Sequence, residues 1–176
     1  MDETGTEAAI LAINALGAGI LLFVSGVIQR MMNDLDALTF KRFAQTLVQT
    51  ATSDPFTVTI GTIPIFAVIY YFVRYGFHHG WFTAGIVIWM IGSSITKIAN
   101  LPVYNWLRDP ENNDPFELRK QRRRLQTGNF WRAWVTLLSV VVMACQFSIA
   151  ATALAVVSCA VIAAPSVWYA RRYFHD

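Results

Sequence analysis

The stretch Ser93–Arg108, with the sequence SSITKIANLPVYNWLR, places a lysine, two asparagines, a tyrosine and a proline inside an otherwise strongly apolar chain. The segments on both sides of it have the composition of membrane helices. We therefore expect the other helices to assemble around this one. We also expect any chemistry that the protein performs to lie here.

The composition predicts an all-α integral membrane protein. The 176 residues are 55% hydrophobic and only 14% charged, whereas about 25% of a soluble domain is charged. Apolar runs of about 18 residues suffice to cross a bilayer as helices, and an open sheet cannot satisfy its backbone there. The net charge of +3 fits the basic loops of membrane proteins. A lipid bilayer is thus the expected partner, and nucleic acid is not.

Four spans are expected to form a four-helix bundle in a single membrane domain, residues 1–176. They lie at about residues 8–29, 55–74, 81–107 and 131–164. The last apolar stretch, 133–170, exceeds the length that one span needs, so it is one long helix or two helices joined near residues 150–152. One helix is favoured, because no Gly, Pro or Asn marks a turn.

The first and third loops are each expected to contain a short amphipathic helix. Asp54-Pro55 is typical of a sharp helix start, and Asp114-Pro115 begins the helix of the third loop, for which Gly128 is a plausible end. Lysines and arginines concentrate in these two loops. The positive-inside rule then makes both loops cytoplasmic and puts both termini on the opposite side.

A polar stripe is predicted on the third span. Ser93, Lys97, Asn100 and Tyr104 follow one another at spacings of four, three and four, which puts them on one helical face. Away from their ends, the predicted spans contain a single charge, Lys97, and such charges usually face a cavity or a partner. Its amine suits a base or a ligand for an anionic oxygen. The alternative is a structural lysine, bonded to helix carbonyls and to Asn14.

Proline 102 predicts a break in the same helix. It has no N–H for the carbonyl of Ile98, and Asn100 and Asn105 are expected to supply donors there. Broken helices with free backbone groups bind ligands in many membrane proteins. Two further polar residues have two interpretations each. Asn14 in the first span makes either an interhelical hydrogen bond or a ligand contact. Gln45 in the first loop either contacts a ligand or is solvated.

Small residues predict close helix contacts, at Ala15 and Gly19 in the first span and at Gly85 and Gly92 in the third. The adjacent histidines 78 and 79 are expected to lie at the membrane interface. No Cys, Asp or Glu stands within ten residues of them, so no metal site is predicted.

Three short motifs resemble the anthrone-oxygenase-like family of small four-helix membrane proteins. The first is the pattern N-x-P-x-x-N at residues 100–105 in the third span. The second is Gln45, followed by a segment ending in Asp54-Pro55-Phe56. The third is the tryptophan-led start of the last span, Asn129-Phe-Trp131-Arg-Ala-Trp134. Together the motifs extend over most of the chain.

The resemblance implies a membrane-embedded oxygenase that oxidises an anthrone methylene to a quinone without a bound metal or flavin. Lys97 or Tyr104 would be the catalytic base, and Asn100 and Asn105 would hold the oxyanion. The remaining substrate-binding candidates are Asn14, Gln45 and Trp131. The expected ligand is a hydrophobic aromatic or lipid-like molecule.

Two other classes of function fit the same sequence. One is a non-catalytic membrane protein that binds a lipid, a quinone or the transmembrane helices of a partner. The other is a small transporter subunit, which would work as a homo-oligomer because four helices rarely enclose a pathway alone. An enclosed polar pocket beside Lys97 favours the enzyme, and a groove open to lipid favours the binding protein.

Overall fold

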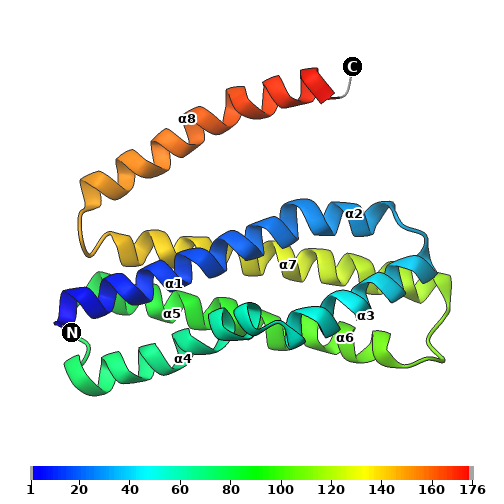
Figure 1. Ribbon diagram of the computed structural model, residues 1–176, viewed down its shortest axis with the longest axis horizontal. Helices are drawn as coiled ribbons and strands as arrows, with labels where there is room; N and C mark the ends of the chain where they lie inside the picture. The colour runs from blue at the N-terminus through cyan, green and yellow to red at the C-terminus, as the bar shows by residue number, and fades with distance from the viewer. Residues whose placement is uncertain (1, 175–176) are drawn as a thin grey trace.

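The computed structural model describes residues 2–174, and every regular element in that range is helical (Figure 1). An all-α fold is thereby confirmed. In chain order the helices are α1 (Glu3–Phe23), the π-helix η1 (Val24–Ile28), α2 (Gln29–Asp34), α3 (Ala37–Ser53), α4 (Pro55–Tyr75), α5 (Gly80–Ile95), the π-helix η2 (Thr96–Asn100), α6 (Leu101–Arg108), α7 (Pro115–Ala144) and α8 (Ile149–Phe174).

Four helical segments are long and apolar enough to span a membrane: Glu3–Asp34, Pro55–Tyr75, Gly80–Arg108 and Ile149–Ala170. The first three match predicted spans, and together the four support a membrane protein. Figure 1 shows that the loop after α2 and the loop after α6 lie at one end of the molecule. The N-terminus and the turn between α4 and α5 lie at the other end. Which end faces the cytoplasm stays a prediction.

The predicted single helix over residues 131–164 is wrong. α7 ends at Ala144, and α8 begins at Ile149 after a short turn. The hydroxyl of Ser148 accepts a hydrogen bond from the backbone N–H of Ala151 at 3.2 Å, so this serine caps the new helix. The packed helices are therefore α7 and the first three spans. α8 leaves them and runs back on its own, with none of its spanning window buried (Figure 1).

Aspartates set the two predicted helix starts. An Asp54 carboxylate oxygen accepts from the N–H of Thr57 at 2.7 Å, and Asp114 accepts from the N–H of Phe116 at 3.1 Å. Both starts are confirmed. The helix of the third loop was predicted to end at Gly128, and this is wrong, because α7 continues to Ala144. Gly128 serves close packing instead: a side chain there would collide with the Asn100 side chain.

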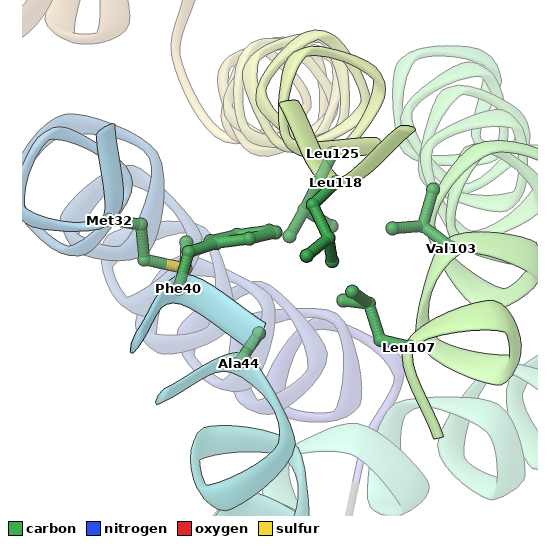
Figure 2. Packing of buried hydrophobic residues seen from close by; sticks show 7 residues of the cluster. All are labelled: Met32, Phe40, Ala44, Val103, Leu107, Leu118 and Leu125. Atoms are coloured by element: carbon green, nitrogen blue, oxygen red, sulfur yellow. The ribbon is translucent and has the colours of Figure 1, made fainter. Parts of the chain in front are cut away.

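The predicted amphipathic helix of the first loop is α3, which packs on the protein. Phe40 and Ala44 are fully buried in a cluster with Met32, Val103, Leu107, Leu118 and Leu125 (Figure 2). The guanidinium of Arg122 lies 4.7 Å from the centre of the Phe40 ring and donates to the carbonyl of Asn33 at 2.8 Å. Arg122 of α7 thus holds the loop between α2 and α3 in place.

α5 and α7 approach each other closely where α5 has glycines. A Cβ atom on Gly85 would lie 2.9 Å from both the Met143 nitrogen and the Ser139 carbonyl oxygen of α7. One on Gly92 would lie 3.0 Å from the Thr136 hydroxyl. The predicted packing face is therefore confirmed. The contact predicted at Gly19 is wrong, because an added Cβ there would meet nothing within 4 Å.

Replacing Gly85 with alanine tests this interface. The new methyl group would meet backbone atoms of α7, which cannot rotate away, so we expect a loss of about 1–3 kcal/mol in the free energy of unfolding. Gly19→Ala is the matched control, since it adds the same methyl group in open space and gains up to about 1 kcal/mol of helix propensity. Denaturant titration in detergent measures both. Equal stability of the two variants would contradict the close contact.

The Asp54 cap predicts a pH dependence. The hydrogen bond from the Thr57 backbone, followed by the one from its side chain, holds the pKa of Asp54 below its usual range. The stabilisation is thus present above the unfolded pKa and lost as the pH falls through the folded value. An asparagine at this position would cap equally well without titrating. Between about pH 5 and about pH 3, we expect the Tm of the wild type to fall further than that of Asp54→Asn. Parallel curves would show that the cap contributes nothing.

Candidate functional site

A cavity of about 480 Å³ lies between α1, α4, α5 and α7. Most of its wall is apolar, and Pro64 in the middle of α4 lines it together with Trp89 of α5. The helices can leave this space because glycines 17, 61 and 92 face it without side chains. Its polar lining is contributed by Asn14, Thr57, Ser93, Ser94, Thr96, Lys97, Arg132 and Thr136.

Lys97 lines this cavity, as predicted for an intramembrane charge. It belongs to η2, one turn after Ser93, and its side chain is exposed rather than enclosed. The cavity lining contains no carboxylate, so no acid opposes the lysine there. Asn14 of α1 also lines the cavity, and its amide donates to the sulfur of Met143 at 3.9 Å. Asn14 therefore makes the expected interhelical contact while it faces the same space.

A second cation, Arg132 of α7, completes the charged wall. It is half-buried, lines the cavity and interacts electrostatically with Tyr104. Arg132 is thus a second charge on the cavity wall, at a position for which the sequence predicted no role. Arg132 follows Trp131 at the predicted edge of the last span. Because α7 starts much earlier than predicted, that edge lies well inside the helix.

Asn100 does not face the cavity; it begins a buried chain of amides. Its Nδ2 donates to Asn129 Oδ1 at 2.8 Å, and Asn129 Nδ2 donates to Gln29 Oε1 at 2.9 Å. Gln29 then donates to Asn33 at 3.1 Å. The chain joins η2, α7 and α2, so it fixes three segments of the bundle. Nothing in the sequence spacing pointed to Gln29 and Asn129 as its members.

The predicted break at Pro102 is wrong, because the π-helix η2 continues directly into α6 at this point. The carbonyl of Ile98, which lacks the proline N–H, accepts from Arg124 Nη2 at 3.4 Å. The freed carbonyl was predicted, but its expected donors, Asn100 and Asn105, are wrong. Asn105 is exposed and lines neither cavity described here.

Tyr104 and Gln45 line a second cavity of about 350 Å³ between α3 and α6. The Gln45 amide donates to the Leu107 carbonyl at 2.6 Å, so its main partner is the end of α6. The predicted stripe is therefore divided: Ser93 and Lys97 face the first cavity, Asn100 the interior and Tyr104 the second cavity. The π-helix η2 lies between these positions and changes the helical register.

Trp131 lies outside both cavities. It is 55% exposed and its ring packs edge-on against Phe130, with 5.6 Å between the ring centres. An exposed aromatic side chain of this kind suits the boundary between membrane and water.

The first cavity thus combines an apolar body with one cationic wall. Lys97 and Arg132 supply positive charge, and the hydroxyls of Ser93 and Thr136 add hydrogen-bonding groups. Such a site favours a hydrophobic molecule that carries a negatively charged or ionisable oxygen.

The amide chain predicts a large effect of a small substitution. Asn129→Ala removes the partner of both the Asn100 amide and the Gln29 carbonyl, and all three side chains are buried. We expect a loss of about 1–3 kcal/mol in the free energy of unfolding. Asn105→Ala, at an exposed site, should change it by less than about 0.5 kcal/mol. Denaturant titration in detergent compares them, and equal losses would rule out a structural role for the chain.

Neither a protein-family model, nor a curated protein, nor a solved structure matches the chain. The resemblance to the anthrone-oxygenase-like family therefore stays a prediction.

Proposed function

We propose that the protein binds a hydrophobic phenol in the cavity between α1, α4, α5 and α7 and oxidises it. The observation that carries the proposal is the cationic wall of this apolar cavity, formed by Lys97 and Arg132 without an opposing carboxylate. A phenolate or enolate oxygen is the complementary ligand. The activity that fits both this ligand and the sequence motifs is a cofactor-free oxygenase of anthrone-type substrates.

In the proposed reaction Lys97 acts as the base in its neutral amine form, and the ammonium that results completes the cationic wall together with Arg132. The Lys97 amine takes a proton from the acidic methylene of the substrate, and the charge delocalises onto the ring oxygen. Arg132, which stays protonated, holds that oxygen. The carbanion reacts with dioxygen and, with a proton returned, becomes a hydroperoxide. Loss of water then leaves a carbonyl. One oxygen atom ends in the quinone and the other in water, so no external reductant is needed.

A second candidate function is non-catalytic binding of an anionic lipid or a quinone. The exposure of Lys97 favours it, because this side chain is accessible from outside the bundle while it lines the cavity. Both candidate functions use the same cationic wall, but only the oxygenase converts the bound molecule into a product.

The test uses the full chain in lipid nanodiscs with unsubstituted anthrone as the probe, followed by oxygen uptake and quinone absorbance. We expect turnover above that of empty nanodiscs. Lys97→Met should lower it about 10²- to 10⁴-fold, because the general base is lost. Lys120→Met is the matched control: this lysine is 68% exposed on α7, beside Glu117, and outside the cavity lining.

Three results separate the candidates. Turnover that needs Lys97 supports the oxygenase. Saturable binding without turnover, weakened by Lys97→Met and by Arg132→Met, supports the binding protein. If Lys97→Met behaves like Lys120→Met in both binding and turnover, the cavity is not the site and both functions are contradicted.

A further inference from the structure

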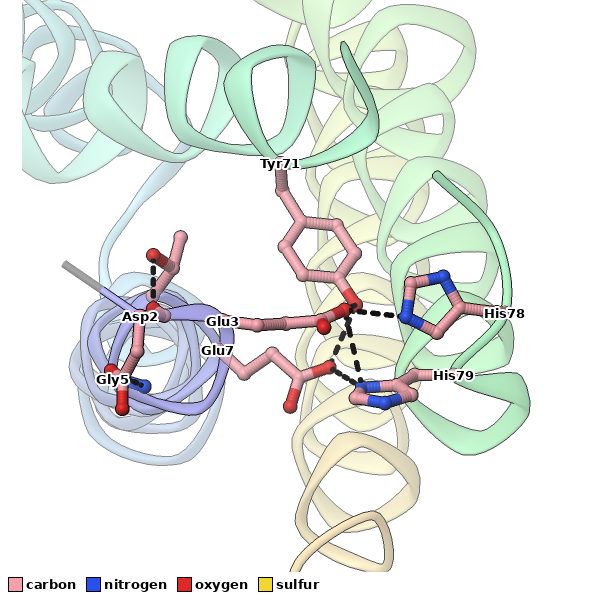
Figure 3. Close-up of polar contacts among 8 residues, drawn as sticks. Asp2, Glu3, Gly5, Glu7, Tyr71, His78 and His79 are labelled. Atoms are coloured by element: carbon pink, nitrogen blue, oxygen red, sulfur yellow. Dashed lines mark hydrogen bonds and ion pairs between the residues drawn. The ribbon is translucent and has the colours of Figure 1, made fainter. Parts of the chain in front are cut away.

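A second cluster of ionisable groups lies at the other end of α1, away from the cavity. Glu3 and Glu7 stand one turn apart on the first turns of α1, so their side chains leave the same face. Opposite them lie His78 and His79 in the turn between α4 and α5, and Tyr71 in the last turns of α4 (Figure 3).

The turn after α4 explains why adjacent histidines converge. Residues 76–79 are not helical: Gly76 has a φ of 83°, in the region that favours glycine, and His79 is extended with φ −83° and ψ 91°. The two rings therefore escape the 100° separation of neighbouring helical residues. They lie with their centres 4.6 Å apart, and both direct a nitrogen toward α1. The carboxylates that sequence spacing had excluded come from about 70 residues upstream.

The distances bring ligand atoms of three residues together and place the Glu7 carboxylate beside them. Glu3 Oε1 lies 2.9 Å from His78 Nε2 and 3.5 Å from His79 Nδ1. Glu7 Oε1 lies 2.6 Å from the same His79 nitrogen. The ligand atoms of Glu3, His78 and His79 all lie within 4.8 Å of one another. In a tetrahedral site with bonds of about 2.0–2.2 Å, neighbouring ligand atoms lie about 3.3–3.6 Å apart. The contacts of Glu3 are close to this separation, whereas the 2.6 Å contact of Glu7 with His79 has to lengthen when a metal binds.

The negative charge of the two carboxylates in the cluster also favours binding of a cation. Two carboxylates meet here, and that of Glu7 is only 2% exposed, in a place where an uncompensated charge is costly. The point between the groups therefore has a negative potential. No lysine or arginine makes an ion pair with either glutamate among residues 2–174.

Tyr71 provides the support that metal ligands usually have. Its ring is fully buried, and its hydroxyl donates to Glu7 Oε1 at 2.7 Å and to Glu3 Oε1 at 3.3 Å. A hydrogen bond to a ligating carboxylate fixes its orientation and raises metal affinity. Asp2, by contrast, is occupied as the N-cap of α1, accepting from the N–H of Gly5 at 3.0 Å.

We propose that Glu3, His78 and His79 form a binding site for Zn²⁺, with Glu3 Oε1, His78 Nε2 and His79 Nδ1 as ligands. Glu7, whose Oε1 lies 2.6 Å from His79 Nδ1, becomes the fourth ligand when the ion replaces that hydrogen bond. Imidazole nitrogens with carboxylate oxygens are a set that Zn²⁺ prefers, whereas Mg²⁺ and Ca²⁺ take oxygen ligands. The ion would join the start of α1 to the turn between α4 and α5. It is a structural site, because Asn14 at the cavity lies two helical turns further along α1.

The experiment uses the full chain in detergent, purified without a histidine tag and stripped with EDTA. Zn²⁺ is titrated while bound metal is measured by mass spectrometry and Tm by tryptophan fluorescence. We expect one Zn²⁺ per chain, a Tm that rises with Zn²⁺, and no rise with Mg²⁺ or Ca²⁺. Failure of the wild type to bind Zn²⁺ above the level of a Glu3→Gln, His78→Ala double variant would overturn the proposal.

Variants assign the site. His78→Ala removes one metal ligand. Because the His78 side chain is 56% exposed, the variant should still fold, while the Zn²⁺-dependent rise in Tm is lost. Tyr71→Phe keeps the buried ring and should weaken Zn²⁺ about 10- to 100-fold. Glu117→Gln, on α7 and away from the cluster, should bind Zn²⁺ like the wild type. If Tyr71→Phe and His78→Ala both bind Zn²⁺ normally, the metal lies elsewhere and the assignment is wrong.

Discussion

The close approach of α5 and α7 is the contact on which the rest of the structure depends. In a lipid environment apolar side chains gain little by leaving lipid for protein, so helices associate through tight packing and hydrogen bonds. Gly85 and Gly92 let the backbone of α5 approach α7, and Gly128 lets α7 approach the end of η2. This one interface places Lys97 and Arg132 on the walls of the same cavity and brings Asn100 to Asn129.

Polar side chains inside the bundle have two kinds of surroundings. Most are satisfied by other protein groups: the amides of Asn100, Asn129 and Gln29 bond in series, and the Lys41 ammonium donates to the Asp109 carbonyl at 2.6 Å. The cavity is different, because its two cations face a space instead of a carboxylate. The bundle thus leaves positive charge available at one place, the cavity wall, and this is the feature on which the proposed binding site rests.

Local signals in the sequence predicted much of this architecture. Asp54-Pro55 and Asp114-Pro115 start helices because capping and proline act within one turn, and the glycines at 85 and 92 mark a packing face. The turn between α7 and α8 was not predicted, because no glycine, proline or asparagine marks it. Ser148 caps the start of α8 there instead.

Contacts between residues far apart in the sequence could not be predicted from residue spacing. A stripe at spacings of four, three and four assumes an unbroken α-helix, so η2 separated Lys97 from Asn100 and Tyr104. The meeting of Glu3 with His78 depends on how α1 packs against α4, which no local pattern encodes. The same limit applies to Arg132, whose role follows from the position of α7 rather than from its neighbours in sequence.

The two π-helices have a consequence for how the chain can vary in length. η1 ends directly before Gln29, and Asn100 is the last residue of η2, so both amides that meet Asn129 lie at the end of such a turn. A π-turn holds one residue more than an α-turn. Deletion of one residue there would rotate everything after it by about 100°, and the amide would leave its partner. Homologous chains should therefore gain and lose residues in the exposed loop at 109–114, and keep their length constant within Val24–Ile28 and Thr96–Asn100.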